Sequence, residues 1–153
     1  MLNNLRFTKA PLISIVDDDP FVRGATDALV RLLGYSAATF ASAEDFLQSS
    51  CINETTCLIS DVQMPGLSGV DLQRVLIAQG IKIPMIFITA YFDERIRQSV
   101  MEAGALGYLS KPFEEESLIE LLQSALGSDR KSLAAPAIKP LLQAGLSRAG
   151  GRR

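Results

Sequence analysis

The sequence predicts an α/β fold, a doubly wound sheet of five parallel strands with helices on both faces. Three apolar runs are nearly continuous rather than alternating, which is the pattern of parallel strands buried on both faces. Amphipathic helical segments separate these runs, and such alternation with short connections is typical of right-handed β-α units. The three runs are LISIV (12–16), CLIS (57–60) and IPMIFI (83–88).

Two weaker strand candidates, YSAATF (35–40) and LGYLS (106–110), bring the number of predicted strands to five. After the first strand, Asp19 can cap a helix whose first turn contains Pro20, and Gly34 can end it. The apolar residues expected on one face of this helix are Phe21, Ala25, Leu29 and Leu32.

The other helices follow from one cap and from apolar residues spaced three and four positions apart. Ser42 can cap a short helix that carries Phe46 and Leu47. Three further stripes predict three more helices, and they consist of Leu72, Val75 and Leu76, then Ile96, Val100 and Ala103, and finally Leu118, Leu122 and Ala125. The β-α unit is therefore repeated five times and ends near Gly127.

Composition divides the chain into an N-terminal extension (1–10), the α/β domain (11–127) and a basic tail or linker rich in Ala, Pro and Gly (128–153). Residues 1–127 hold 16 acidic and 9 basic residues, a net charge of −7, whereas 128–153 hold 1 acidic and 6 basic residues, a net charge of +5. We expect the acidic domain to repel nucleic acid, so that only the tail favours it.

No apolar run reaches the roughly 18 residues that a membrane span needs, and the first residues lack the layout of a secretion signal. We therefore expect a cytoplasmic protein that does not contact a membrane. The two cysteines, Cys51 and Cys57, are expected to be reduced and inert. The sequence has no histidine, which removes the commonest general base and the commonest ligand of transition metals.

Charged and polar residues follow four of the five predicted strands. A run of aspartates that includes Asp17 and Asp18 follows the first strand, and Asp61 follows the third. Thr89 follows the fourth strand and Lys111 follows the fifth. Because the carboxyl ends of parallel strands open on the same edge of a sheet, we expect these side chains to converge on one pocket.

The chemistry of this set points to phosphoryl transfer. Clustered carboxylates repel one another, and either a raised pKa or a bound divalent cation reduces that cost. Oxygen ligands without histidine favour Mg²⁺ over zinc or copper. Beside such a cation one carboxylate can attack phosphorus, while Lys111 pairs with phosphate and Thr89 donates a hydrogen bond. No small-molecule cofactor is expected.

Smaller features of these loops have ordinary structural explanations. Asp19 is expected only to cap the helix that begins at Pro20. Pro65 and Gly66 fit the two central positions of a type II turn, which would hold the backbone after the third strand close to the metal. Gly69 is interpreted as a plain turn residue.

The residues of these loops lie in four segments, SIVDDDP, LISDVQMPGLSG, ITA and GYLSKPF. The order and separations of these four segments resemble the receiver domain of bacterial response regulators, most closely the FixJ-like type. The resemblance covers roughly residues 11–126. It implies a flavodoxin-like topology with strand order 2-1-3-4-5 and five helices. It also implies a phosphorylation-dependent switch of a two-component phosphorelay.

The resemblance implies a role for each acidic residue of the pocket. Asp61 is the expected phosphoacceptor. Asp18 is expected to bind Mg²⁺ directly and Asp17 largely through water. The backbone carbonyl of Gln63 is expected to complete the protein ligands.

The resemblance also implies how the switch works. Thr89 and Lys111 are expected to contact the phosphoryl group, and Tyr108 occupies the position of the family's aromatic switch residue. Inward movement of Thr89 leaves space for the Tyr108 ring, which alters the surface of the fourth helix, fifth strand and fifth helix. The peptide bond before Pro112 is expected to be cis, as it often is in this family.

The implied partners are a sensor histidine kinase and either a downstream protein or a second copy of the chain. The domain itself is expected to bind no nucleic acid. It is not expected to be an enzyme beyond catalysing its own phosphorylation and dephosphorylation.

Two other classes fit the sequence less well. A flavodoxin-like cofactor protein shares the strand order, but its first loop binds a phosphate, which Asp17 and its two acidic neighbours would repel. A hydrolase of the haloacid dehalogenase type uses Asp-x-Asp, and here Gln63 occupies the second acidic position.

The output of the switch has two interpretations. FixJ-like receivers commonly precede a helix-turn-helix DNA-binding domain, but only 26 residues follow Gly127. We expect a single-domain regulator, because the basic tail is typical of a natural end. The alternative is the N-terminal receiver of a DNA-binding transcriptional regulator whose output domain is not in this chain.

Overall fold

The computed structural model describes residues 10–126, so the predictions for the tail (128–153) and for almost all of the N-terminal extension (1–10) lie outside the described residues. Five strands and five α-helices alternate within 10–126, as predicted. The strands are β1 (Leu12–Val16), β2 (Ser36–Phe40), β3 (Thr55–Asp61), β4 (Met85–Thr89) and β5 (Gly107–Ser110). The helices are α2 (Pro20–Leu32), α3 (Ala43–Gln48), α4 (Gly69–Ala78), α5 (Glu94–Glu102) and α6 (Glu115–Leu126), with a short 3-10 helix, η1 (Ser50–Asn53).

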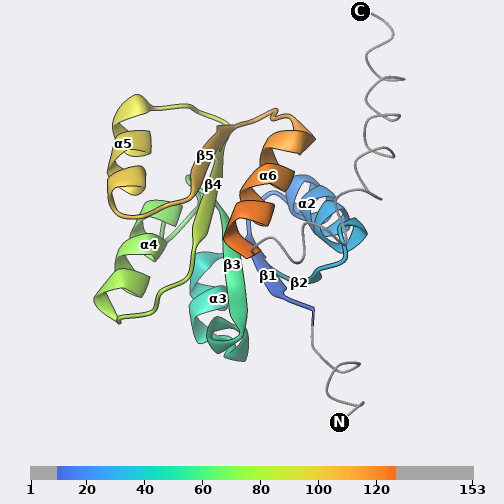
Figure 1. Ribbon diagram of the computed structural model, residues 1–153. Helices are drawn as coiled ribbons and strands as arrows, with labels where there is room; N and C mark the ends of the chain where they lie inside the picture. The colour runs from blue at the N-terminus through green and yellow to red at the C-terminus, as the bar shows by residue number, and fades with distance from the viewer. Residues whose placement is uncertain (1–9, 127–153) are drawn as a thin grey trace, which may run out of the picture.

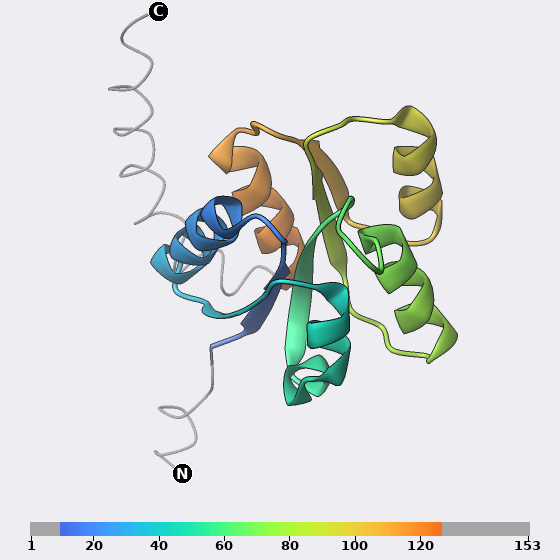
Figure 2. The ribbon, with the colours of Figure 1, turned by 180° about the vertical axis from the view of Figure 1, so that it is seen from behind.

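All neighbouring strands pair in parallel, and their order is β2-β1-β3-β4-β5, which confirms the predicted sheet. Helices α2 and α6 cover one face of the sheet, and α3, α4 and α5 cover the other (Figure 1). The view from behind shows the same two layers (Figure 2). The strand order reverses between β1 and β3, and the carboxyl ends of strands at such a point are where ligands bind in this class of sheet.

Each layer of helices packs on its own hydrophobic core, and β4 contributes to both. Ile86 and Ile88 belong to the cluster beneath α2 and α6, whereas Met85 and Phe87 belong to the cluster beneath α3, α4 and α5. Successive side chains of a strand point to opposite faces, so a sheet covered on both sides needs an apolar residue at every position. This requirement explains why the strand is a continuous apolar run in the sequence.

The fourth strand begins two residues later than predicted. Ile83 and Pro84 precede β4, because Pro84 has no N–H to donate to the ladder. Its carbonyl oxygen still accepts a hydrogen bond from the N–H of Leu58 at 2.9 Å.

Helix α2 begins as predicted, because the Asp19 side chain accepts a hydrogen bond from the N–H of Phe21 at 2.9 Å. The predicted apolar face is wrong at three of its four positions, since Phe21 is 85% exposed, Leu32 is 47% exposed and Ala25 is exposed as well, so that only Leu29 is buried. The hydroxyl of Thr26 donates to the carbonyl oxygen four residues earlier at 2.8 Å, which lets this polar residue be buried. The buried residues of α2 and its C-cap are Thr26, Leu29, Val30 and Leu33.

Serine caps fix the starts of two other helices. Ser42 caps α3 as predicted, and its side chain accepts a hydrogen bond from the N–H of Asp45 at 3.0 Å. Ser68 and Asp71 form a reciprocal capping box at the start of α4. This capping box fixes the end of the loop that follows β3.

Both cysteines are free thiols, and burial raises the pKa of Cys57 to about 12. The Cys57 thiol therefore stays protonated near neutral pH, in keeping with the expected inert role. Of the helices within residues 10–126, none combines the length and the apolar character that a bilayer crossing requires.

Candidate functional site

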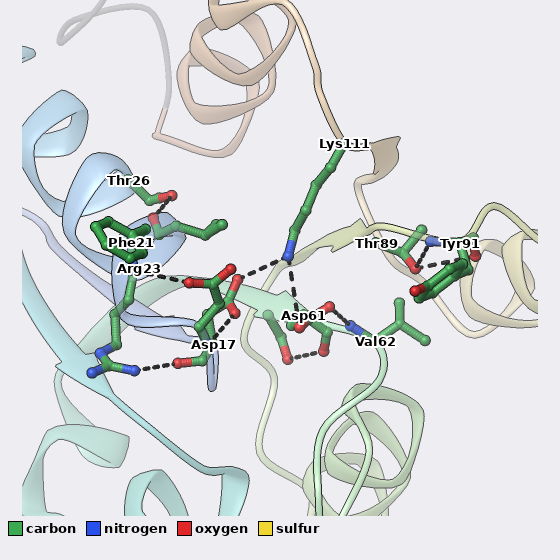
Figure 3. A network of polar contacts seen from close by, with 12 residues as sticks. Asp17, Phe21, Arg23, Thr26, Asp61, Val62, Thr89, Tyr91 and Lys111 are labelled. Carbon is green, nitrogen blue, oxygen red and sulfur yellow. Dashed lines mark hydrogen bonds and ion pairs between the residues drawn. The ribbon is translucent and has the colours of Figure 1, made fainter.

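The sheet brings the predicted site residues to one edge. Asp17 directly follows β1, Asp61 is the last residue of β3 and Thr89 is the last residue of β4. Lys111 directly follows β5, and its side chain extends toward the two aspartates (Figure 3). The site is therefore built from the ends of four adjacent strands.

Three carboxylates form an acidic cluster. One carboxylate oxygen from each of Asp17, Asp18 and Asp61 lies within 4.8 Å of the others. Asp17 and Asp61 are 3% and 7% exposed, whereas Asp18 is exposed. The Oδ1 atoms of the two buried carboxylates accept backbone hydrogen bonds, Asp17 from Asp19 at 2.9 Å and Asp61 from Val62 at 2.8 Å. These bonds fix the orientation of both buried side chains.

The ammonium group of Lys111 lies between the two buried carboxylates. Its Nζ is 3.3 Å from Oδ2 of Asp17 and 3.7 Å from Oδ2 of Asp61. The backbone N–H of Lys111 donates to the carbonyl oxygen of Thr89 at 2.7 Å, and the Lys111–Pro112 peptide bond is cis, as expected. The main chain therefore fixes the start of a side chain that crosses from β5 to β3 and β1.

The environment of Asp61 raises its pKa from 3.8 to about 6. Burial is the largest cause, and the negative charge of Asp17 acts in the same direction. The positive charge of Lys111 and the N–H of Val62 lower the pKa, but they offset only part of the increase. Asp61 is thus ionised at neutral pH at a free-energy cost that an additional positive charge would reduce.

The donor set fits a hard divalent cation. Three carboxylates face one ammonium group, so the cluster has a local net charge of −2. Carboxylate oxygens are the ligands that Mg²⁺ prefers, and a cation among them would offset the repulsion that raises the pKa of Asp61. Gln63 is exposed two residues after Asp61, and the role of its backbone carbonyl stays a prediction.

The hydroxyl of Thr89 does not contact Asp61. It donates to the carbonyl oxygen of Tyr91 and accepts from the N–H of Tyr91, both at 3.1 Å (Figure 3). Thr89 is fully buried, whereas Tyr91 is 70% exposed at the rim of the site. A contact between Thr89 and a phosphoryl group would therefore replace these two hydrogen bonds to Tyr91.

Tyr108 lies on β5, with its hydroxyl close to the start of α5. The hydroxyl oxygen accepts a hydrogen bond from the N–H of Asp93 at 3.4 Å. The ring packs edge-on against Phe92, with centroids 5.4 Å apart and planes at 77°. Burial raises the pKa of Tyr108, so its hydroxyl stays protonated. Tyr108 thus links β5 to the loop that carries Tyr91 and to the first turn of α5.

Sequence reasoning missed the role of Gly69. A Cβ atom at this position would overlap the backbone carbonyl oxygen of Asp61. The N–H of Gly69 donates to the carbonyl oxygen of Val62 at 2.8 Å, so α4 begins directly against the backbone of the acidic cluster. A glycine at the first helical position, where most residues are better helix formers, was the available signal. The predicted turn at Gly66 agrees with its φ of 78°.

Sequence reasoning also missed Arg23. This residue lies in α2, and its Nη1 donates a hydrogen bond of 2.7 Å to the backbone carbonyl oxygen of Asp17. Figure 3 shows the guanidinium group beside the main chain of Asp17, on the side away from Lys111.

Comparison with known proteins places the chain in a family. Residues 13–123 match the response regulator receiver domain. The chain is 40% identical to nodulation protein W of Bradyrhizobium diazoefficiens (81% of this chain, 54% of that protein) and 42% identical to the response regulator protein TodT of Pseudomonas putida (77% and 52%). It thus spans about half the length of these curated relatives.

Solved structures agree with the sequence comparison. The crystal structure of FixJ-N matches with a TM-score of 0.68 and 33% identity, over 77% of this chain and 94% of that one. The structure of the response regulator StyR matches with a TM-score of 0.72 and 36% identity, over 94% of this chain and 72% of that one. The strand order, the acidic edge of the sheet and these matches lead to one conclusion: the chain belongs to the receiver domain family of two-component response regulators and is FixJ-like.

Proposed function

We propose that this chain is a phosphorylation-dependent switch that accepts a phosphoryl group on Asp61 from a sensor histidine kinase. The position of Asp61 is the observation that carries the proposal. This carboxylate is buried at the edge of the sheet, beside two other carboxylates and 3.7 Å from the ammonium group of Lys111. Membership of the receiver family supports the kinase as the source of the phosphoryl group.

The acidic cluster holds Mg²⁺ in this proposal. Asp18 and Asp61 would hold the ion directly, Asp17 would do so largely through water, and the backbone carbonyl of Gln63 would complete the protein ligands. When bound, the ion neutralises charge on the oxygens of the phosphoryl group. Lys111 supplies a second positive charge for the same oxygens, because its ammonium group already lies beside Asp61.

Phosphoryl transfer needs no separate general base. A carboxylate oxygen of Asp61 bonds to phosphorus while the P–N bond of the phosphohistidine breaks, and the imidazole nitrogen keeps that electron pair. The nucleophile is mostly ionised at neutral pH, because its pKa is about 6. The product is an acyl phosphate, and water later returns it to aspartate and inorganic phosphate. The chain catalyses only these two reactions on itself.

The phosphoryl group then recruits the hydroxyl of Thr89, which gives up its bonds to Tyr91. The Tyr108 ring moves into the space that Thr89 leaves, and its hydroxyl loses the contact with Asp93. These movements change the surface formed by α5, β5 and α6. A ligand that favours one of two existing states by a few kcal/mol is sufficient for such a change.

The changed surface controls either a partner protein or self-association, and we place the switch in the cytoplasm. Residues 11–127 form the receiver, and 128–153 serve as tail or linker. A DNA-binding output beyond this chain is the second candidate. It is favoured by relatives such as the transcriptional regulatory protein FixJ of Bradyrhizobium diazoefficiens, of which the match covers 56%. The position of the stop codon in the parent gene distinguishes the two.

The test is incubation of the full chain with acetyl phosphate and MgCl₂, followed by measurement of acid-labile phosphate and by size-exclusion chromatography. Wild type is expected to form an acyl phosphate that EDTA prevents, and Asp61→Asn is expected to form none. Asp45→Asn makes the same substitution at an exposed position on α3 and should label like wild type. Equal labelling of Asp61→Asn and wild type refutes the proposal.

A further inference from the structure

We propose that Arg23 is a positioning residue of the magnesium site, which it serves by holding the peptide between Asp17 and Asp18. The inference rests on the proposed function, because it concerns the same site. It adds a residue from α2 to a site that otherwise consists of side chains and carbonyls at the strand ends.

The contact itself is short and charge-assisted. Nη1 of Arg23 donates to the carbonyl oxygen of Asp17 at 2.7 Å, and the side chain is partly buried where it crosses from α2 to the loop (Figure 3). Hydrogen bonds from an ionised donor are shorter and about twice as strong as neutral ones. A guanidinium group is also planar, so its direction is more restricted than that of an ammonium group.

The rest of Asp17 is fixed by other partners. Its N–H donates to the carbonyl oxygen of Phe40 at 3.1 Å, and its carboxylate is held by Asp19 and Lys111. Only Arg23 contributes a hydrogen bond to the Asp17 carbonyl oxygen among the described residues. Loss of Arg23 would therefore free the direction of one peptide while leaving the Asp17 side chain in place.

That peptide determines where Asp18 lies. The carbonyl of Asp17 and the N–H of Asp18 belong to one planar unit, so the direction of the carbonyl sets the direction in which Asp18 leaves the chain. The carboxylate of Asp18 is exposed and makes no hydrogen bond or ion pair within residues 10–126. Its place opposite Asp61 in the acidic cluster thus depends on the backbone that Arg23 holds.

The test compares Mg²⁺ affinities obtained from the Mg²⁺ dependence of the thermal unfolding midpoint at constant ionic strength. Arg23→Met is expected to weaken Mg²⁺ binding by about tenfold, as is typical when a group that orients a ligand is removed. Arg23→Lys restores a charged donor and is expected to bind within about threefold of wild type.

Arg31→Met is the matched control. Arg31 lies in the last turn of α2, and its Nη2 also donates to a backbone carbonyl oxygen, that of Ala37, at 2.9 Å. Removing it costs a similar contact, together with an ion pair to Asp27 at 2.9 Å, at the opposite end of the helix from the acidic loop. Its Mg²⁺ affinity is expected to stay within about twofold of wild type, even if its unfolding midpoint falls.

The outcomes separate this inference from the proposed function. If wild type binds Mg²⁺ and Arg23→Met binds it equally well, or if Arg31→Met loses as much affinity, the positioning role of Arg23 is overturned and the magnesium site stands. If wild type does not bind Mg²⁺, the magnesium site and the role of Arg23 both fail. Should Arg23→Met not fold, Arg23→Gln, which keeps a neutral N–H donor, takes its place and is expected to weaken binding by more than Arg23→Lys does.

Discussion

Replacement of Asp61 by asparagine is expected to stabilise the protein when no metal is bound. Burial and the charge of Asp17 raise the pKa of Asp61 from 3.8 to about 6. Since one pKa unit corresponds to about 1.4 kcal/mol, ionised Asp61 destabilises the folded state at pH 7.5 by about 3 kcal/mol. Asparagine carries no charge, and its amide oxygen can still accept the hydrogen bond from the N–H of Val62.

The stability that Asp61→Asn gains over wild type depends on pH, and the sign of this dependence follows from the direction of the pKa shift of Asp61. Because the pKa is higher in the folded state, the folded state binds more protons than the unfolded state between pH 3.8 and about 6. Wild type therefore loses stability as the pH rises through this interval. The advantage of Asp61→Asn is expected to be about 3 kcal/mol at pH 7.5 and about 1 kcal/mol at pH 4.5.

Urea unfolding in EDTA, followed by far-ultraviolet circular dichroism at both pH values, measures this advantage. Asp45→Asn, at an exposed position on α3, is the control and should change stability by less than about 0.5 kcal/mol. Addition of MgCl₂ at pH 7.5 is expected to stabilise wild type more than Asp61→Asn. An Asp61→Asn variant that is no more stable than wild type at pH 7.5, or whose advantage does not shrink at pH 4.5, contradicts the reasoning.

Three other substitutions test separate contacts by urea unfolding. Gly69→Ala is expected to cost about 1–3 kcal/mol, because the added methyl group overlaps the carbonyl oxygen of Asp61, whereas Gly24→Ala in open space on α2 should be neutral or stabilising. Lys111→Gln should destabilise the metal-free protein by about 1–3 kcal/mol, since two buried carboxylates lose their cation, and added MgCl₂ should recover part of that loss. An unchanged free energy of unfolding in the metal-free variant would refute this expectation. Asp19→Ala should cost about 1 kcal/mol through loss of the α2 cap but leave Mg²⁺ affinity unchanged, so a large fall in affinity would make Asp19 part of the site.

The sheet could be predicted because its strands are buried on both faces. Such strands need an apolar residue at nearly every position, so a run such as 57–60 is visible without knowledge of its neighbours. The placement of Asp17, Asp61 and Lys111 at one edge follows from parallel pairing alone. Their predicted proximity is a consequence of topology rather than of any single motif.

Features that depend on individual side-chain and backbone contacts could not be predicted in the same way. The buried face of α2 includes Thr26, whose hydroxyl donates a hydrogen bond to a carbonyl oxygen of the same helix. Because Thr26 is polar, the pattern of apolar residues predicts Phe21 on that face instead. The hydrogen bond from Arg23 to Asp17 joins an ordinary helical arginine to a backbone atom, which no side-chain pattern reveals. Gly69 looked like a turn residue because the backbone that it touches comes from another element.

The two hydrogen bonds between the Thr89 hydroxyl and the Tyr91 main chain also affect how often the proposed switch would reach its active arrangement without phosphorylation. Each such bond contributes about 1 kcal/mol, so pulling the hydroxyl away from both costs about 2 kcal/mol. An energy gap of that size leaves only about 3% of molecules with the hydroxyl released at any moment. In the proposed switch, the bonds that tie the Thr89 hydroxyl to its own turn would thus limit the active state before phosphorylation, and weakening that turn is expected to raise that state in the absence of a kinase.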